Sequence, residues 1–297
     1  MRKGHNLFSG TGVAIVTPFK RSGAIDFDAF EKIIEHVVNG GVNYIVLLGT
    51  TGESATLSKQ EKKTLIKFTV KFLNGRIPLV LGMGGNDTNE IILSIHATPF
   101  QGVDAILSVC PYYNKPQQEG VYQHFKTIAE ASPVPVILYT VPGRTGSNIS
   151  ASTTLRLARD CDNIAGIKEA SGNLDQIFQV IAHRPEGFLV ISGDDALTLP
   201  LIASGADGVI SVTANAYPSM VAGIVEHTMA GKLKEARLLH YQLLELTNSL
   251  FADGSPSGIK AALEIKKLCE NVVRLPLVPV SDEAYSRIHQ AIKKLEQ

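Results

Sequence analysis

The sequence of 297 residues predicts a (β/α)8 barrel followed by a helical extension. Three observations predict this fold. Eight short apolar runs recur along the chain, segments with helical periodicity separate them, and their spacing fits one strand, one helix and two loops. The runs are apolar throughout rather than alternating in polarity, which is typical of strands buried on both faces of a parallel sheet.

The eight predicted strands are rich in β-branched residues. In order along the chain they cover residues 12–19, 44–49, 78–83, 105–110, 135–140, 164–168, 188–192 and 208–212. A doubly wound sheet is the alternative arrangement of such units. We favour the barrel because no strand is followed by a glycine-rich dinucleotide fingerprint with an acidic residue about 20 positions later.

The segments between the strands carry helix start and stop signals. Asp26 precedes a segment whose apolar residues share one face and which ends at Gly40–Gly41. Ser58 and Glu61 form a capping box at the start of another helix. Further N-caps are predicted at Asp87, Ser150, Asn173 and Asp195.

Helical patterns continue after the eighth strand. They cover residues 218–230, 232–251, 259–271 and 281–295, the last of which begins at Ser281. We therefore divide the chain into a barrel domain that carries the active site, residues 1–230, and a C-terminal helical extension, residues 231–297.

Composition excludes several classes of protein. The 28 basic and 28 acidic residues cancel, which argues against a nucleic-acid or anionic-membrane binder. The 44% of hydrophobic residues are enough for a core. The apolar stretch 13–16 is too short for a signal peptide, no run is long enough to span a membrane, and the three cysteines lack disulfide or metal spacing. We expect a cytoplasmic protein.

The active site of a barrel enzyme lies at the carboxyl ends of its strands, and Lys168 closes the apolar strand 164–168. A dehydrated barrel wall disfavours the ammonium form, so Lys168 is a candidate nucleophile that forms a Schiff base with a ketone. The alternative is a lysine buried in a salt bridge with a barrel carboxylate.

Other polar side chains follow neighbouring strands. In the turn GTTGE (49–53), glycines let backbone amides approach a carboxylate, while Thr50 and Thr51 supply hydroxyls. The phenols of Tyr113 and Tyr139 can pass protons at the barrel mouth. Arg144, in a predicted loop, suits recognition of a carboxylate. Each residue also has a purely structural alternative. The threonines would be polar residues of a tight turn, the tyrosines would be aromatic residues packed at the barrel rim, and the arginine would be a solvated loop residue.

Two observations argue against further kinds of chemistry. None of the eight histidines falls at a strand end, since seven lie in predicted helices and His5 lies near the terminus, so histidine-ligated metal catalysis is disfavoured. Asp194 and Asp195 follow the seventh strand, where barrels often bind phosphate, and their charge disfavours a phosphorylated substrate. Capping of the next helix is their structural alternative.

Six ordered blocks carry a family resemblance: GTTGESATLS from 49, PYYNKPQQEG from 111, ILYTVPGRTG from 137, GIKEASGNL from 166, SGDD from 192 and GVISVTAN from 208. Together they resemble the dihydrodipicolinate synthase family of the class I pyruvate-aldolase superfamily. The resemblance implies that Lys168 forms an imine with pyruvate and that Tyr139 is the proton donor and acceptor. Thr50 and Tyr113 would complete the relay, with Tyr113 supplied by a neighbouring subunit.

The resemblance also implies the binding residues and the reaction. Thr51, the main chain at Ile210 and Gly193 would hold pyruvate, and Arg144 would receive the carboxylate of L-aspartate 4-semialdehyde. The product would be 4-hydroxy-tetrahydrodipicolinate, in lysine and diaminopimelate biosynthesis. The resemblance implies no metal or organic cofactor and a homotetramer built as a dimer of dimers.

The sequence departs from the family pattern at two places. Thr140 follows the tyrosine of strand 135–140 where many members have asparagine. The positions that match a lysine-binding regulatory cleft are Ala55, Lys59, Asn86, Glu90 and Tyr112. Lys59 stands where some lysine-sensitive members have histidine, and a cation there disfavours a lysine ligand, so feedback inhibition stays open.

Two other functions are alternatives for this sequence. One is another 2-oxo-acid aldolase, such as N-acetylneuraminate lyase or a 2-keto-3-deoxy sugar acid aldolase. Thr51 and Arg144 disfavour it because they suit a short carboxylated aldehyde rather than a polyol. The other is a non-catalytic barrel that binds a metabolite, which the set of Lys168, Tyr139 and Thr50 disfavours.

Overall fold

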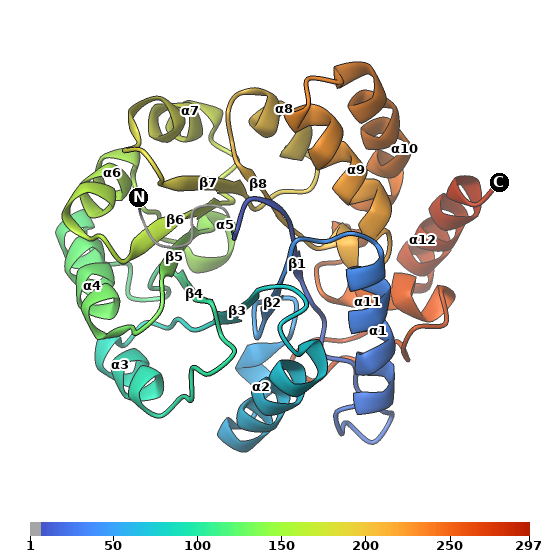
Figure 1. Ribbon diagram of the computed structural model, residues 1–297. Coiled ribbons are helices and arrows are strands. Elements are labelled where there is room, and N and C mark those ends of the chain that lie inside the picture. The colour runs from blue at the N-terminus through green and yellow to red at the C-terminus, as the bar shows by residue number, and fades with distance from the viewer. Residues whose placement is uncertain (1–6) are drawn as a thin grey trace.

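The computed structural model describes residues 7–297, in which eight parallel strands form a closed barrel (Figure 1). Each strand pairs with the next in sequence, and β8 pairs with β1. The strands are β1 (Gly10–Ala14), β2 (Tyr44–Leu47), β3 (Leu79–Gly82), β4 (Ala105–Val109), β5 (Val136–Thr140), β6 (Ile164–Glu169), β7 (Leu189–Ser192) and β8 (Gly208–Ser211). The predicted (β/α)8 barrel is confirmed and the doubly wound alternative is wrong.

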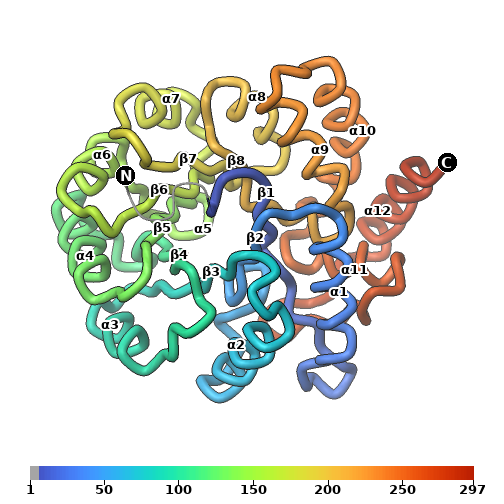
Figure 2. The backbone as a smooth tube through the Cα atoms, in the orientation of Figure 1, coloured from blue at the N-terminus to red at the C-terminus, as the bar shows by residue number. Residues whose placement is uncertain are grey.

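Helices surround the barrel in the tube view (Figure 2). The helices of residues 7–297 are α1 (Phe27–Asn39), α2 (Lys59–Leu73), α3 (Thr88–His96), α4 (Gln118–Ala131), α5 (Pro142–Thr145), α6 (Ala151–Asp160), α7 (Leu174–His183), α8 (Thr198–Ala203), α9 (Pro218–Met229), α10 (Leu233–Phe251), α11 (Ser257–Ile265) and α12 (Asp282–Leu295). Side-chain caps confirm the predictions at Asp26, Asp87, Ser150 and Asn173 and the capping box of Ser58 and Glu61.

The predicted N-cap at Asp195 is wrong. Helix α8 begins at Thr198 and has Leu197 at its cap position, with no side-chain cap. The Asp195 carboxylate instead accepts hydrogen bonds from the Ser211 hydroxyl and from the amides of Val212 (3.0 Å) and Thr213 (3.3 Å). Asp195 therefore holds the end of β8, because its carboxylate accepts from amides that have no partner strand after β8 stops.

Two predicted boundaries differ from the structure by more than two residues. Strand β1 ends at Ala14 rather than at residue 19, because the Val16 amide donates to the Asn215 side chain (3.1 Å) instead of a neighbouring strand. Helix α11 ends at Ile265 rather than at residue 271, because Lys267 adopts a left-handed conformation with φ 59° and breaks the helix.

Two layers of apolar side chains form the core. One fills the barrel and includes Tyr44, Val46, Ile137, Tyr139 and Ile191. The other lies between the strands and the surrounding helices. Alternation along each strand assigns successive residues to the two layers, so Tyr139 faces the interior while Thr140 faces the helices. Across residues 7–297, no helix is long and apolar enough to cross a membrane.

The C-terminal helices pack against one another and against the barrel. Helix α10 packs on α9 and α12, and α11 packs on α12 and on the 3₁₀ turn η2 (Thr213–Asn215). Helix α12 lies outside the ring of barrel helices (Figure 2). Helix α11 is largely buried, with Ile259, Ala261, Ala262 and Leu263 inaccessible to solvent together with the charged Lys260.

A buried histidine predicts pH-dependent stability. His124 on α4 bonds to the Thr88 hydroxyl through Nδ1 (2.8 Å), while its Nε2 is buried without a partner in the described chain. Burial lowers the pKa of His124 to about 4. As the pH falls, His124 is therefore protonated in the unfolded chain before it is protonated in the folded protein. The contribution of neutral His124 to stability is fully present above a pH of about 6.5 and is lost as the pH falls toward 4.

Because of His124, we expect the free energy of unfolding to fall by about 2 kcal/mol between pH 7 and pH 5. In His124→Gln, which keeps a polar group for Thr88 but does not titrate, the loss over that interval should be smaller by this amount. Urea unfolding at the two pH values measures the difference. The exposed His289→Gln variant is the control, and an identical pH dependence in wild type and His124→Gln would contradict the assignment.

Candidate active site

Lys168 and Tyr139 lie side by side inside the barrel. The two residues are register partners on the neighbouring strands β6 and β5. The side-chain nitrogen of Lys168 lies 4.4 Å from the centroid of the Tyr139 ring, and both side chains are more than nine-tenths buried. Among residues 7–297, no carboxylate forms an ion pair with Lys168. The arrangement supports the nucleophile interpretation over the buried salt bridge.

Gly193 makes room for the Lys168 side chain. A Cβ atom at this position would lie 2.9 Å from Cε of Lys168 and 2.7 Å from Cβ of Ala170, closer than such atoms approach in proteins. The Gly193 amide donates to the carbonyl of Glu169 (2.7 Å), which holds the backbone after β7 against the end of β6. Gly193 therefore lies directly beside the lysine.

The turn GTTGE follows β2 and presents two different threonines. Thr51 is buried and Thr50 is exposed at the mouth of the barrel. The Thr17 hydroxyl donates to the carbonyl of Gly52 (2.7 Å), which ties the turn to the segment after β1. The turn thus has a fixed backbone with one buried and one accessible hydroxyl.

The other predicted site residues lie on the remaining strand ends. Ile210 is buried on β8. Arg144 is exposed, and it belongs to the short helix α5 rather than to a loop, because Pro142 starts a turn that the left-handed Gly146 ends. Its guanidinium donates to the carbonyl of Ser255 (3.3 Å). The arginine is therefore anchored at one nitrogen and accessible to a ligand.

Tyr113 projects away from the chain. It lies in the connection from β4 to α4, has a left-handed φ of 73° and is 89% exposed. Its side chain forms no hydrogen bond or ring contact within the described part of the chain. An aromatic residue held in this conformation and left exposed fits a contact with another molecule better than a role in packing.

The five candidate regulatory positions lie at neighbouring strand ends. Ala55 and Lys59 follow β2, Asn86 and Glu90 follow β3, and Tyr112 follows β4. All five are exposed, and the amide of Asn86 donates to the carbonyl of Tyr112 (3.3 Å). The structure therefore places them on one side of the barrel mouth.

Two buried carboxylates support the site from outside the barrel. Burial raises the pKa of Glu169, against hydrogen bonds from Gln176 (2.5 Å) and Ser171 (3.1 Å). Burial likewise raises the pKa of Asp195, against its bonds to Ser211 and to the backbone. In the described residues no group of three or more histidine, cysteine, aspartate or glutamate side chains could hold a metal ion.

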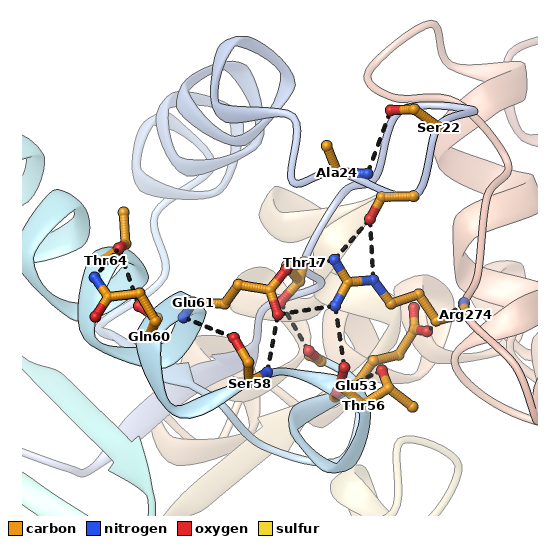
Figure 3. Close-up of polar contacts among 12 residues, drawn as sticks. Thr17, Ser22, Ala24, Glu53, Thr56, Ser58, Gln60, Glu61, Thr64 and Arg274 are labelled. Carbon is orange, nitrogen blue, oxygen red and sulfur yellow. Dashed lines mark hydrogen bonds and ion pairs between the residues drawn. The ribbon is translucent and has the colours of Figure 1, made fainter.

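Sequence reasoning missed an ionic network behind the turn GTTGE. Glu53 and Lys260 form an ion pair whose side chains are fully buried, although 207 positions separate them. Arg274 forms an ion pair with Glu61 and lies next to Glu53 in the close-up (Figure 3). Glu53 is the last residue of the turn GTTGE, but the sequence predicts no role for it. Nothing in the sequence around Lys260 distinguishes that lysine from others.

A (β/α)8 barrel that holds a buried lysine beside a tyrosine near its mouth has the architecture of a class I aldolase. The chain belongs to the dihydrodipicolinate synthetase family, whose model matches residues 7–295. The resemblance seen in the sequence is thereby confirmed.

Individual relatives match over nearly the whole chain. A 4-hydroxy-tetrahydrodipicolinate synthase of Flavobacterium psychrophilum is 50% identical, over 98% of this chain and 99% of its own. The structure of dihydrodipicolinate synthase from Thermotoga maritima has a TM-score of 0.95 at 38% identity, covering 98% of this chain and 99% of its own. The chloride-inhibited dihydrodipicolinate synthase from Acinetobacter baumannii, complexed with pyruvate, has a TM-score of 0.94 at 41% identity, covering 97% and 99%.

Proposed function

We propose that the chain is a lyase of amino-acid biosynthesis that condenses pyruvate with L-aspartate 4-semialdehyde to give 4-hydroxy-tetrahydrodipicolinate. The observation that carries this proposal is the buried Lys168 beside Tyr139, without a counter-ion in residues 7–297. Relatives that bear this enzyme's name match at 42% identity or more over nearly the full chain, and they support the choice of substrates.

Lys168 starts the reaction as a nucleophile. Its amine attacks the ketone carbon of pyruvate, and loss of water from the carbinolamine leaves an imine. A proton then leaves C3 of pyruvate, and the resulting enamine forms a carbon–carbon bond to the aldehyde carbon of the second substrate. The amino group of that substrate displaces Lys168, which closes the ring and frees the enzyme. The protonated imine accepts the electrons, so these steps call for no cofactor.

Proton transfer falls to the hydroxyls around the lysine. Tyr139 is the donor and acceptor in carbinolamine formation and collapse, because its ring already lies against Lys168. Thr50 and Tyr113 extend the relay to solvent. Tyr113 of one subunit acts in the site of its neighbour within a homotetramer, and the exposure of its ring supports that assignment.

Substrate binding falls to the strand ends. Thr51, Gly193 and the main chain at Ile210 hold the pyruvyl group, and Arg144 receives the carboxylate of the semialdehyde through a charge-assisted hydrogen bond. We place the reaction in lysine and diaminopimelate biosynthesis, in the cytoplasm. The exposed positions Ala55, Lys59, Asn86, Glu90 and Tyr112 form the candidate lysine cleft.

The substrate assignment is tested by offering three aldehyde partners with pyruvate. We expect carbon–carbon bond formation with L-aspartate 4-semialdehyde, detected as the cyclic product by mass spectrometry, and none with N-acetylmannosamine or glyceraldehyde. The reason is that Arg144 offers a guanidinium for a short carboxylated aldehyde. Condensation only with the sugars would instead identify a sugar-acid aldolase.

A further inference from the structure

A buried ion pair joins the turn GTTGE to the C-terminal helices. Lys260 on α11 forms an ion pair with one carboxylate oxygen of Glu53 and donates to the carbonyl of Val272 (2.8 Å). The other carboxylate oxygen of Glu53 accepts from the amide of Arg274 (2.9 Å). Within residues 7–297, the polar partners of the Glu53 side chain therefore all come from residues 260–274.

The backbone of the turn is fixed by short-range bonds at the same place. The Glu53 amide donates to the carbonyl of Thr50 (3.1 Å), and Glu53 itself has a left-handed φ of 52°. The neighbouring Gly52 is held by Thr17. Thr50 accepts this bond through its own carbonyl, and Thr51 lies between Thr50 and Glu53 in the turn, so a shift of Glu53 would move both threonines.

Arg274 extends the link to the start of α2. Its guanidinium donates to the carbonyls of Gly23 and Thr56 and pairs with Glu61 (Figure 3). This pairing lowers the pKa of Glu61 to about 2. The Phe19 ring lies under both cations, 4.1 Å from the Lys260 nitrogen and 4.3 Å from the central guanidinium carbon of Arg274. The network thus joins the turn both to the start of α2 and to residues 260–274.

Stability alone explains such a pair poorly. Removing two charges from water costs much of what their attraction returns, and buried ion pairs are often replaceable by apolar residues without loss of stability. A buried ion pair instead fixes geometry, because a charge-assisted hydrogen bond orients the carboxylate and the backbone that bears it. A fixed backbone matters most where hydroxyls must meet a small ligand.

We propose that Glu53 and Lys260 are positioning residues that hold Thr50 and Thr51 in the geometry for pyruvate binding and proton transfer, so that the C-terminal helices complete the site without touching substrate. This inference rests on the proposed function.

The test compares wild type with Glu53→Gln/Lys260→Met, which removes both charges and leaves neither ion alone in the interior. Each protein is treated with borohydride over a range of pyruvate concentrations, and mass spectrometry measures the fraction reduced at Lys168. We expect the pyruvate concentration for half-maximal trapping to rise at least tenfold in the variant. The matched control, Glu245→Gln/Lys294→Met, removes an exposed ion pair between α10 and α12 and should leave this concentration unchanged.

Thermal unfolding separates positioning from stability. A folded variant whose half-maximal concentration stays within twofold of wild type would overturn the inference. If the double variant does not fold, Glu53→Gln alone is read by the same criterion, since its amide oxygen still accepts from Arg274. Absence of any adduct in wild type would instead refute the proposed function, so the two failures are distinguishable.

Discussion

Replacing Lys168 by alanine is expected to reduce kcat by at least about a thousandfold, because the barrel strands described in residues 7–297 contain no second lysine that could form the imine. The protein should remain folded, since the change removes a buried amine that forms no ion pair with residues 7–297. Steady-state condensation of pyruvate with L-aspartate 4-semialdehyde measures the loss, and circular dichroism checks the fold.

The control for this prediction is Lys63→Ala, which removes an exposed lysine from α2. Activity of the control should equal that of wild type. A folded Lys168→Ala variant that keeps more than a tenth of the wild-type kcat would rule out an imine at this residue.

Removing the Tyr139 hydroxyl is expected to reduce kcat by about 10²- to 10⁴-fold, the range for loss of a general acid–base group. Tyr139→Phe keeps the ring that lies 4.4 Å from the Lys168 nitrogen, so packing around the lysine should be preserved. The imine should still form, but slowly. Rapid-quench mixing with pyruvate, with borohydride as the quench, measures the rate of imine formation.

Tyr122→Phe provides the comparison for Tyr139. Tyr122 on α4 donates its hydroxyl to Asp160 (2.9 Å) outside the barrel, so this variant also deletes a phenol hydroxyl but should leave the rate of imine formation unchanged. Equal rates in Tyr139→Phe and wild type would assign the proton transfer to another group.

Much of the fold could be predicted because the barrel repeats one physical pattern. Strands buried on both faces must be apolar throughout, and helices between them need caps, so both signals are local. Lys168 could be singled out for the same reason, since a lysine at the end of an apolar strand is unusual. The prediction at residues 15–19 failed because apolar composition does not reveal that Asn215 takes the Val16 amide.

The contacts that sequence reasoning missed are long-range. Asp194 and Asp195 are chemically equivalent in the sequence, and only the approach of β8 decides that Asp195 binds its amides. Glu53 and Lys260 meet because the chain returns from α11 to the turn after β2, and no local pattern encodes that return. Such pairings depend on the assembled fold rather than on any one segment.

The central claim is that Lys168 forms an imine with pyruvate, and reductive trapping tests it most directly. The protein is incubated with saturating pyruvate and borohydride, digested, and examined by peptide mass spectrometry. The account predicts one reduced pyruvyl adduct, on the peptide that contains Lys168, and none in Lys168→Ala. No adduct on the wild-type protein, or an adduct confined to a different lysine, would contradict it.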